Sequence, residues 1–197
     1  MITFYIKNCR VSVSFFFVAA AAALLVIDQS GLSLLTFLSA AFHEAGHFLA
    51  MSFIGVRLSQ IRVTPFGMDI EKSQCVQRSY CRDLCVSLSG PLMNLIAGVV
   101  SATLNNADFA NINFALAAFN LLPIEPLDGG QALYSLLCNR FSSDRSAKIV
   151  SVISFVTLLP LAVLGFLSVF RSPWNFSLLL TCVYLIFLLV FKSGRYY

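Results

Sequence analysis

The sequence contains few charged residues. They make up 11% of its 197 positions, whereas soluble domains usually have about a quarter. Hydrophobic residues make up 58%, and the mean hydropathy is +0.84. One soluble core could not bury so many apolar side chains, which excludes an ordinary soluble domain. We therefore predict an integral membrane protein in contact with the lipid bilayer.

Several other features are also missing. No basic cluster contains interleaved aromatic residues, so we expect no nucleic-acid partner. None of the 6 cysteines forms a Cys-x-x-Cys pair. Cys81 and Cys85 lie four apart, and we interpret them as reduced thiols rather than as a metal site. Because no internal repeat or flexible linker is visible, we expect a single domain over residues 1–197.

Apolar runs of the length that crosses a bilayer recur along the chain. A spanning helix needs about 20 mostly apolar residues. The sequence predicts six spans, at about 11–27, 32–54, 84–104, 109–122, 147–170 and 174–191. If both termini are cytoplasmic, 12 of the 13 lysines and arginines lie inside and only Arg171 lies outside, as the positive-inside rule requires. The first run could instead be a signal peptide, although it is long for one.

The polar segment after the second run has strand character. Apolar and polar residues alternate over about 56–71, and Pro65-Phe66-Gly67 is a turn signal. We predict a small membrane-associated β-hairpin on the cytoplasmic side, whose edge could pair with an extended substrate. The alternative is a connecting loop. The predicted fold class is thus an all-α integral membrane protein with six transmembrane helices and this hairpin.

Both histidines of the chain lie in the second apolar run, in the stretch His43-Glu44-Ala45-Gly46-His47. A spacing of four places both imidazoles on one face of a helix, where two histidines can bind one zinc ion. Glu44 is rotated by about 100° from His43, so it can reach a water as a general base. A charge in mid-membrane costs at least about 2.5–3.5 kcal/mol, which favours a function. The alternative is a polar contact between helices.

A hydrolytic zinc site needs a third protein ligand and one open position. There is no third histidine, so a carboxylate or cysteine must serve. His43 lies about 18 Å along an inward-running helix at about 1.5 Å per residue, nearer the cytoplasm. The fourth run also leads inward, to an irregular segment that contains two prolines and Asp128. We predict Asp128 as the third ligand, with Glu125 as the weaker alternative because it lies closer to the prolines.

Three motifs in this order resemble the site-2 protease family of intramembrane zinc metalloproteases, peptidase family M50. They are HEAGH at 43–47, SGPLMN at 89–94 and NLLPIEPLDGG at 120–130. The small size, the six spans and the absence of a PDZ insertion look most like the stage IV sporulation protein FB subgroup. Many of its members carry a C-terminal CBS domain. We expect no such domain here, and therefore no nucleotide regulation through it.

The resemblance implies roles for individual residues. His43, His47 and Asp128 would bind one Zn²⁺ ion, and Glu44 would be the catalytic base. Asn94 and Asn120 would lie near the site and bind substrate or the developing oxyanion. The residues alone indicate only interhelical hydrogen bonds for these two asparagines. Glu125 departs from the apolar residue that relatives commonly have.

The function that the resemblance implies is cleavage of a membrane-tethered protein near the cytoplasmic face of a bacterial cell membrane. In this subgroup the substrate is a pro-sigma factor of spore formation, and a regulatory membrane protein would be a further partner. Two alternatives stay open. One is a membrane scaffold with a structural zinc ion, and the other is a metal or proton transporter, although transporters often show repeated halves.

Overall fold

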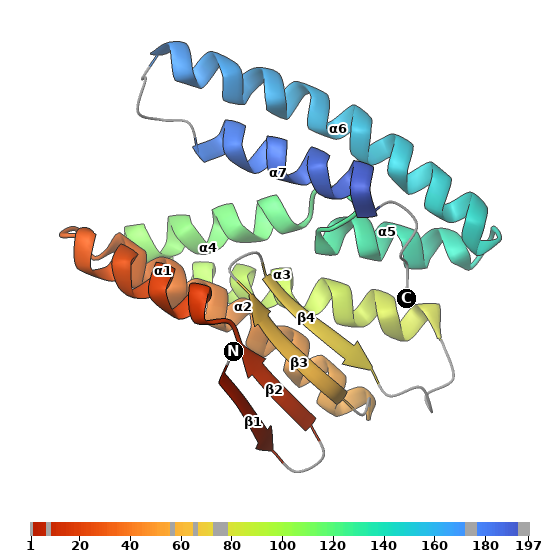
Figure 1. Cartoon of the computed structure of the whole chain (residues 1–197), viewed down its shortest axis with the longest axis horizontal. Coiled ribbons are helices and arrows are strands. Elements are labelled where there is room, and N and C mark those ends of the chain that lie inside the picture. The colour runs from red at the N-terminus through yellow and green to blue at the C-terminus, as the bar shows by residue number, and fades with distance from the viewer. Residues whose placement is uncertain are drawn as a thin grey trace. The chain divides into compact units, whose positions relative to one another are not determined.

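Helices make up most of the protein. The computed structural model describes residues 2–6, 9–55, 58–64, 67–72, 79–171 and 177–192 (Figure 1). Its helices are α1 (Phe15–Ile27), α2 (Leu32–Ile54), α3 (Tyr80–Thr103), α4 (Ala107–Asn120), α5 (Asp128–Cys138), α6 (Ser143–Arg171) and α7 (Ser177–Lys192). The chain divides into two compact units, of which one comprises Met1–Arg78 and Met93–Phe114 and the other Ser79–Leu92 and Ala115–Tyr197.

A four-stranded sheet belongs to the first unit. Its order is β1-β2-β3-β4, formed by β1 (Ile2–Ile6), β2 (Cys9–Val13), β3 (Leu58–Thr64) and β4 (Gly67–Lys72). The pairs β1–β2 and β3–β4 are antiparallel, and β2–β3 is parallel. A parallel pair needs a long crossover, and here α1 and α2 lie in the connection between β2 and β3.

The sheet agrees with one prediction and corrects another. The hairpin predicted over 56–71 corresponds to β3 and β4, which pair with Thr64 opposite Gly67. Pro65 and Phe66 of the predicted turn lie outside the described residues. The fold is mostly helical, as predicted, but the expectation of a single hairpin is corrected, because β1 and β2 form a second hairpin at the N-terminal end. This second hairpin was not predicted because residues 11–13, which belong to β2, were assigned to the apolar run that contains α1.

The helices follow the predicted spans with shifted ends. α2 has the predicted bounds of 32–54, whereas α5 lies in a segment that the sequence left irregular. Among the described residues, two helical stretches are long and apolar enough to cross a membrane, Tyr80–Thr103 and Ser143–Phe170. Val18–Ile27 and Leu178–Val190 are shorter apolar stretches. The count of six spans stays a prediction.

A carboxylate in the preceding turn fixes the start of α2. Asp28 accepts hydrogen bonds from the hydroxyl and the backbone N–H of Ser30, and from the N–H of Ser33 in the first helical turn. These bonds hold the pKa of the Asp28 carboxyl well below its usual range, and the bond from the Ser30 hydroxyl has the largest effect. The carboxylate therefore stays charged beside the positive end of the helix dipole. Gly31 lies between Asp28 and α2 and has a φ of 77°, a left-handed conformation that glycine adopts without steric cost.

The core of the second unit holds the segment before α5 in place. Ile124 is fully buried and packs with Leu158 of α6 and Leu185 of α7. The Glu125 N–H donates to the Ser154 hydroxyl at 2.8 Å, and that hydroxyl donates to the Val150 carbonyl at 2.7 Å. The irregular backbone thus has both apolar and hydrogen-bonded contacts with α6.

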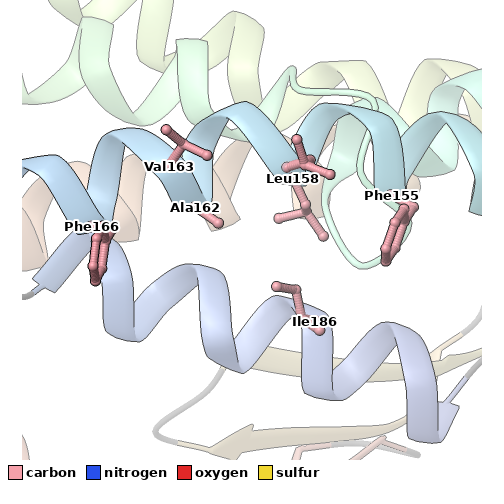
Figure 2. A pocket seen from close by; sticks show the side chains of 7 residues that line it. Phe155, Leu158, Ala162, Val163, Phe166 and Ile186 are labelled. Carbon is pink, nitrogen blue, oxygen red and sulfur yellow. The ribbon is translucent and has the colours of Figure 1, made fainter.

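An apolar cavity of about 340 Å³ lies between α6 and α7 (Figure 2). Its lining includes Phe155, Leu158, Ala162, Val163, Phe166 and Ile186. The lining side chains are hydrocarbon, so the cavity offers no group for chemistry.

Two glycines allow α5 to start close to the preceding loop. A Cβ at Gly129 would overlap the Leu121 carbonyl, and a Cβ at Gly130 would overlap the Ile124 carbonyl. Both obstacles are backbone atoms, which cannot rotate away. The sequence Asp128-Gly129-Gly130 therefore permits an approach that other residues would prevent, and this approach determines where Asp128 begins the helix.

We predict that Gly130→Ala lowers the free energy of unfolding by about 1–3 kcal/mol or more, the usual cost of overpacking. The measurement is thermal unfolding in detergent. Gly98→Ala is the matched control, because its Cβ would meet the Phe114 ring at 2.7 Å, and a side chain can shift. An equal loss of stability in the two variants would contradict the close approach to backbone.

Candidate metal centre

α2 brings both histidines of the chain together. His43 and His47 lie one helical turn apart, with 7% and 8% of their surfaces exposed. Their Nε2 atoms are 3.2 Å apart, and the ring planes meet at 77°. The spacing of four residues in the sequence has thus produced two converging nitrogen atoms in a buried place, as predicted.

The distance between these nitrogens fits a shared metal ion. Two nitrogen ligands at about 2.0–2.1 Å from a tetrahedral zinc ion lie about 3.3–3.4 Å from each other. The observed 3.2 Å is close to this value. A hydrogen bond between the two atoms would need the proton on His47 Nε2, because the contacts of His43 place the proton of that ring on Nδ1.

Asn94 of α3 determines the tautomer of His43. The Asn94 Oδ1 lies 2.8 Å from the His43 Nδ1, and a carbonyl oxygen can only accept. His43 Nδ1 therefore carries the proton and donates it. A neutral imidazole has one N–H, so its Nε2 keeps a lone pair for a metal. Such a partner on the second ring nitrogen is a regular feature of metal-binding histidines.

The amide group of Asn94 is fully engaged. Its Nδ2 donates to the backbone carbonyl of Ser39 at 3.1 Å and to the Asn113 Oδ1 at 2.9 Å, and the side chain is fully buried. The interhelical hydrogen bonds expected from the residues alone are confirmed. Both amide hydrogens are donated within the protein, and the expected role of Asn94 toward substrate or an oxyanion stays a prediction.

Asn120 lies at the end of α4 and is partly buried. Its Nδ2 donates to the Leu116 carbonyl of the same helix at 3.0 Å. This is a contact within one helix and not the interhelical hydrogen bond that the residues alone indicated. The expected role of Asn120 toward substrate stays a prediction.

Asp128 is the first residue of α5, and its side chain is partly buried. A carboxylate in this position is stabilised by the helix dipole. His43 and His47 belong to the first unit of the chain and Asp128 to the second, and the role of Asp128 as the third ligand stays a prediction.

Glu44 lies beside His43 on α2 and is partly buried. Sequence reasoning missed two further residues of this region, Ser39 and Asn113. Ser39 contributes its backbone carbonyl, which no side-chain pattern marks. Asn113 could have been noticed, because an asparagine inside an apolar helix needs a hydrogen-bond partner.

Comparison with known proteins identifies related families and one related structure. The family described as Peptidase M50B-like matches residues 16–124, and Peptidase family M50 matches residues 106–161. The chain is 27% identical over 168 residues to a zinc metalloprotease of Methanocaldococcus jannaschii, which covers 79% of this chain and 47% of that protein. It is 27% identical over 171 residues to stage IV sporulation protein FB of Bacillus subtilis, which covers 81% and 59%.

The chain thus spans about half the length of these relatives. A solved structure of a site-2 protease from Methanocaldococcus jannaschii has a TM-score of 0.71 at 24% identity, covering 100% of this chain and 96% of the other, which shows a shared fold. The M50B-like match takes in more than half of the sequence, from residue 16 to residue 124. The chain therefore belongs to peptidase family M50.

Proposed function

We propose that this chain is a zinc-dependent intramembrane endopeptidase that cleaves a membrane-tethered protein near the cytoplasmic face. The observation that carries the proposal is the pair of buried imidazole nitrogens, 3.2 Å apart, with the tautomer of His43 fixed by Asn94. The family consists of multi-pass membrane proteins and implies zinc. Six spans, both termini in the cytoplasm and a bacterial cell membrane belong to the same proposal.

The donor set suits one zinc ion. His43, His47 and Asp128 would hold it, which leaves one position for water or substrate, as in hydrolytic zinc sites. A bound zinc ion would supply Lewis acidity and would lower the pKa of a water toward about 7. The burial of both histidines favours this use, because the low dielectric around them strengthens charge interactions.

Glu44 moves the protons of the reaction. In the sequence it adjoins His43, so its carboxylate can accept a proton from the attacking water as the oxygen bonds to the scissile carbonyl carbon. The carbon–nitrogen bond then breaks, and the carboxylic acid of Glu44 returns the proton to the leaving amine. Asn120 would bind the substrate backbone near this centre.

The sheet offers a way to present the substrate. β4 is an edge strand, and an extended peptide can add to such an edge through backbone hydrogen bonds. Pairing of this kind would unwind a helical substrate before cleavage. The likeness to stage IV sporulation protein FB supports a pro-sigma factor as substrate, with sporulation as the context and a membrane protein as regulator.

We predict that Glu44→Gln retains zinc but lowers cleavage at least about 100-fold, within the range that general acid–base catalysis contributes. Co-expression with a membrane-tethered substrate measures the product, and metal analysis measures zinc. Asp108→Asn, an exposed substitution in the first turn of α4, should leave both unchanged. Undiminished product with Glu44→Gln would exclude the assignment, and a wild-type protein that binds zinc but cuts nothing would favour a scaffold.

We predict that Asp128→Asn weakens zinc binding by at least about tenfold, because a neutral amide replaces a charged ligand. Competition with a coloured chelator measures the affinity of the purified protein. Asp144→Asn provides the control, since Asp144 is also an acid in the first turn of its helix but is exposed. Normal zinc affinity in the Asp128 variant would remove this residue from the ligand set.

A further inference from the structure

We propose that Asn113 of α4 is a positioning residue of the metal centre, acting on His43 through Asn94. The proposal deepens the proposed function and rests on it for the identity of the metal. Asn113 touches no residue of the predicted ligand set in the contacts described above. Its effect is carried by the direction in which two buried amide groups point.

The chain of hydrogen bonds has a fixed direction. Asn113 Nδ2 donates to the Phe109 backbone carbonyl at 2.8 Å, so its Oδ1 faces away from that carbonyl. Asn94 Nδ2 donates to this Oδ1 at 2.9 Å. Asn94 Oδ1 in turn accepts from the His43 Nδ1 at 2.8 Å. Each amide therefore accepts on one side and donates on the other.

Each of the two asparagine amides also donates to a backbone carbonyl. The Phe109 carbonyl receives Asn113, and the Ser39 carbonyl receives the second hydrogen of Asn94 at 3.1 Å. A backbone carbonyl can only accept, so neither amide can turn over without placing two acceptors or two donors against each other. The orientation of Asn94 is consequently determined from α2 and α4 together.

A reversed Asn94 would have a direct chemical consequence. It would present Nδ2 to the imidazole, so His43 Nδ1 would have to accept and the ring proton would move to Nε2. A protonated Nε2 has no lone pair for a metal. The acceptor on Asn113 opposes this reversal, and its removal leaves only the Ser39 carbonyl to do so.

Burial makes these contacts costly to lose. Asn94 and Asn113 are both fully buried, and an unsatisfied polar group in such a place loses its hydrogen bond to water without replacement. Hydrogen bonds in series also polarise one another in a low dielectric. Asn113 therefore has more influence on His43 than its separation from the ring suggests.

The test compares three variants of the full chain. Asn113→Leu removes the acceptor, whereas Asn113→Asp keeps an oxygen toward Asn94. Asn111→Leu makes the same chemical change at an exposed position of α4 and is the matched control. Zinc affinity by chelator competition is the first readout. We expect a loss of about 10–100-fold in Asn113→Leu, a loss of only a few-fold in Asn113→Asp, and no loss in Asn111→Leu.

The second readout is the histidine tautomer in the metal-free protein. The chain has only 2 histidines, so ¹⁵N-histidine labelling without a polyhistidine tag gives two imidazole spin systems. We expect His43 to be protonated at Nδ1 in the wild type and to shift toward Nε2 protonation in Asn113→Leu. A purely structural role of Asn113 would lower stability without moving this signal.

Several outcomes would overturn the proposal. They are a wild-type His43 protonated at Nε2, an unchanged tautomer and zinc affinity in Asn113→Leu, and an equal loss in Asn111→Leu. If Asn113→Leu does not fold, the wild-type tautomer and the smaller replacement Asn113→Ser still decide the question. A wild type that binds no zinc but shows Nδ1 protonation and the variant shift would contradict the proposed function while supporting this inference.

Discussion

The hydrogen bond between Asn94 and His43 is the interaction on which the metal centre depends. A helix in an apolar environment already uses its backbone groups, so a polar side chain there must find a partner on another helix. His43 finds it on α3, and Asn94 finds its own partners on α2 and α4. The requirement to satisfy one imidazole therefore holds three helices in a defined relation and leaves one nitrogen for a metal.

The parts of the site that follow from helix periodicity could be predicted from the sequence. His43, Glu44 and His47 needed only the knowledge that residues 32–54 are helical, and α2 has these bounds. The hairpin of β3 and β4 could be predicted because apolar and polar residues alternate on both sides of a turn signal. The strand β2 was not, since residues 11–13 lie in the same mostly apolar run as α1 and show no turn signal between the two elements. α5 was missed because prolines and glycines precede its apolar face.

Contacts between distant residues could not be predicted, because their partners are chosen by packing. Asn94 and His43 are separated by 51 residues, and Asn94 and Asn113 by 19. The motif containing Asn94 suggested a place near the site, but only the folded structure shows that its side chain contacts the imidazole of His43. The overlap that a Cβ would cause at Gly129 and Gly130 is also a property of the folded backbone.

The predicted ligands are positioned by two different physical means. The histidines depend on a chain of directed hydrogen bonds, in which one reversed amide changes the chemistry of a nitrogen without changing its place. Asp128 depends on steric fit. The start of α5 lies against backbone carbonyls that leave no room for a Cβ at Gly129 or Gly130, and the preceding Ile124 packs in the apolar core. Substitutions of the first kind should alter the tautomer and metal affinity in addition to stability, whereas those of the second kind act through the fold alone. The proposed metal centre would thus be sensitive to chemistry at α2 and to volume at α5.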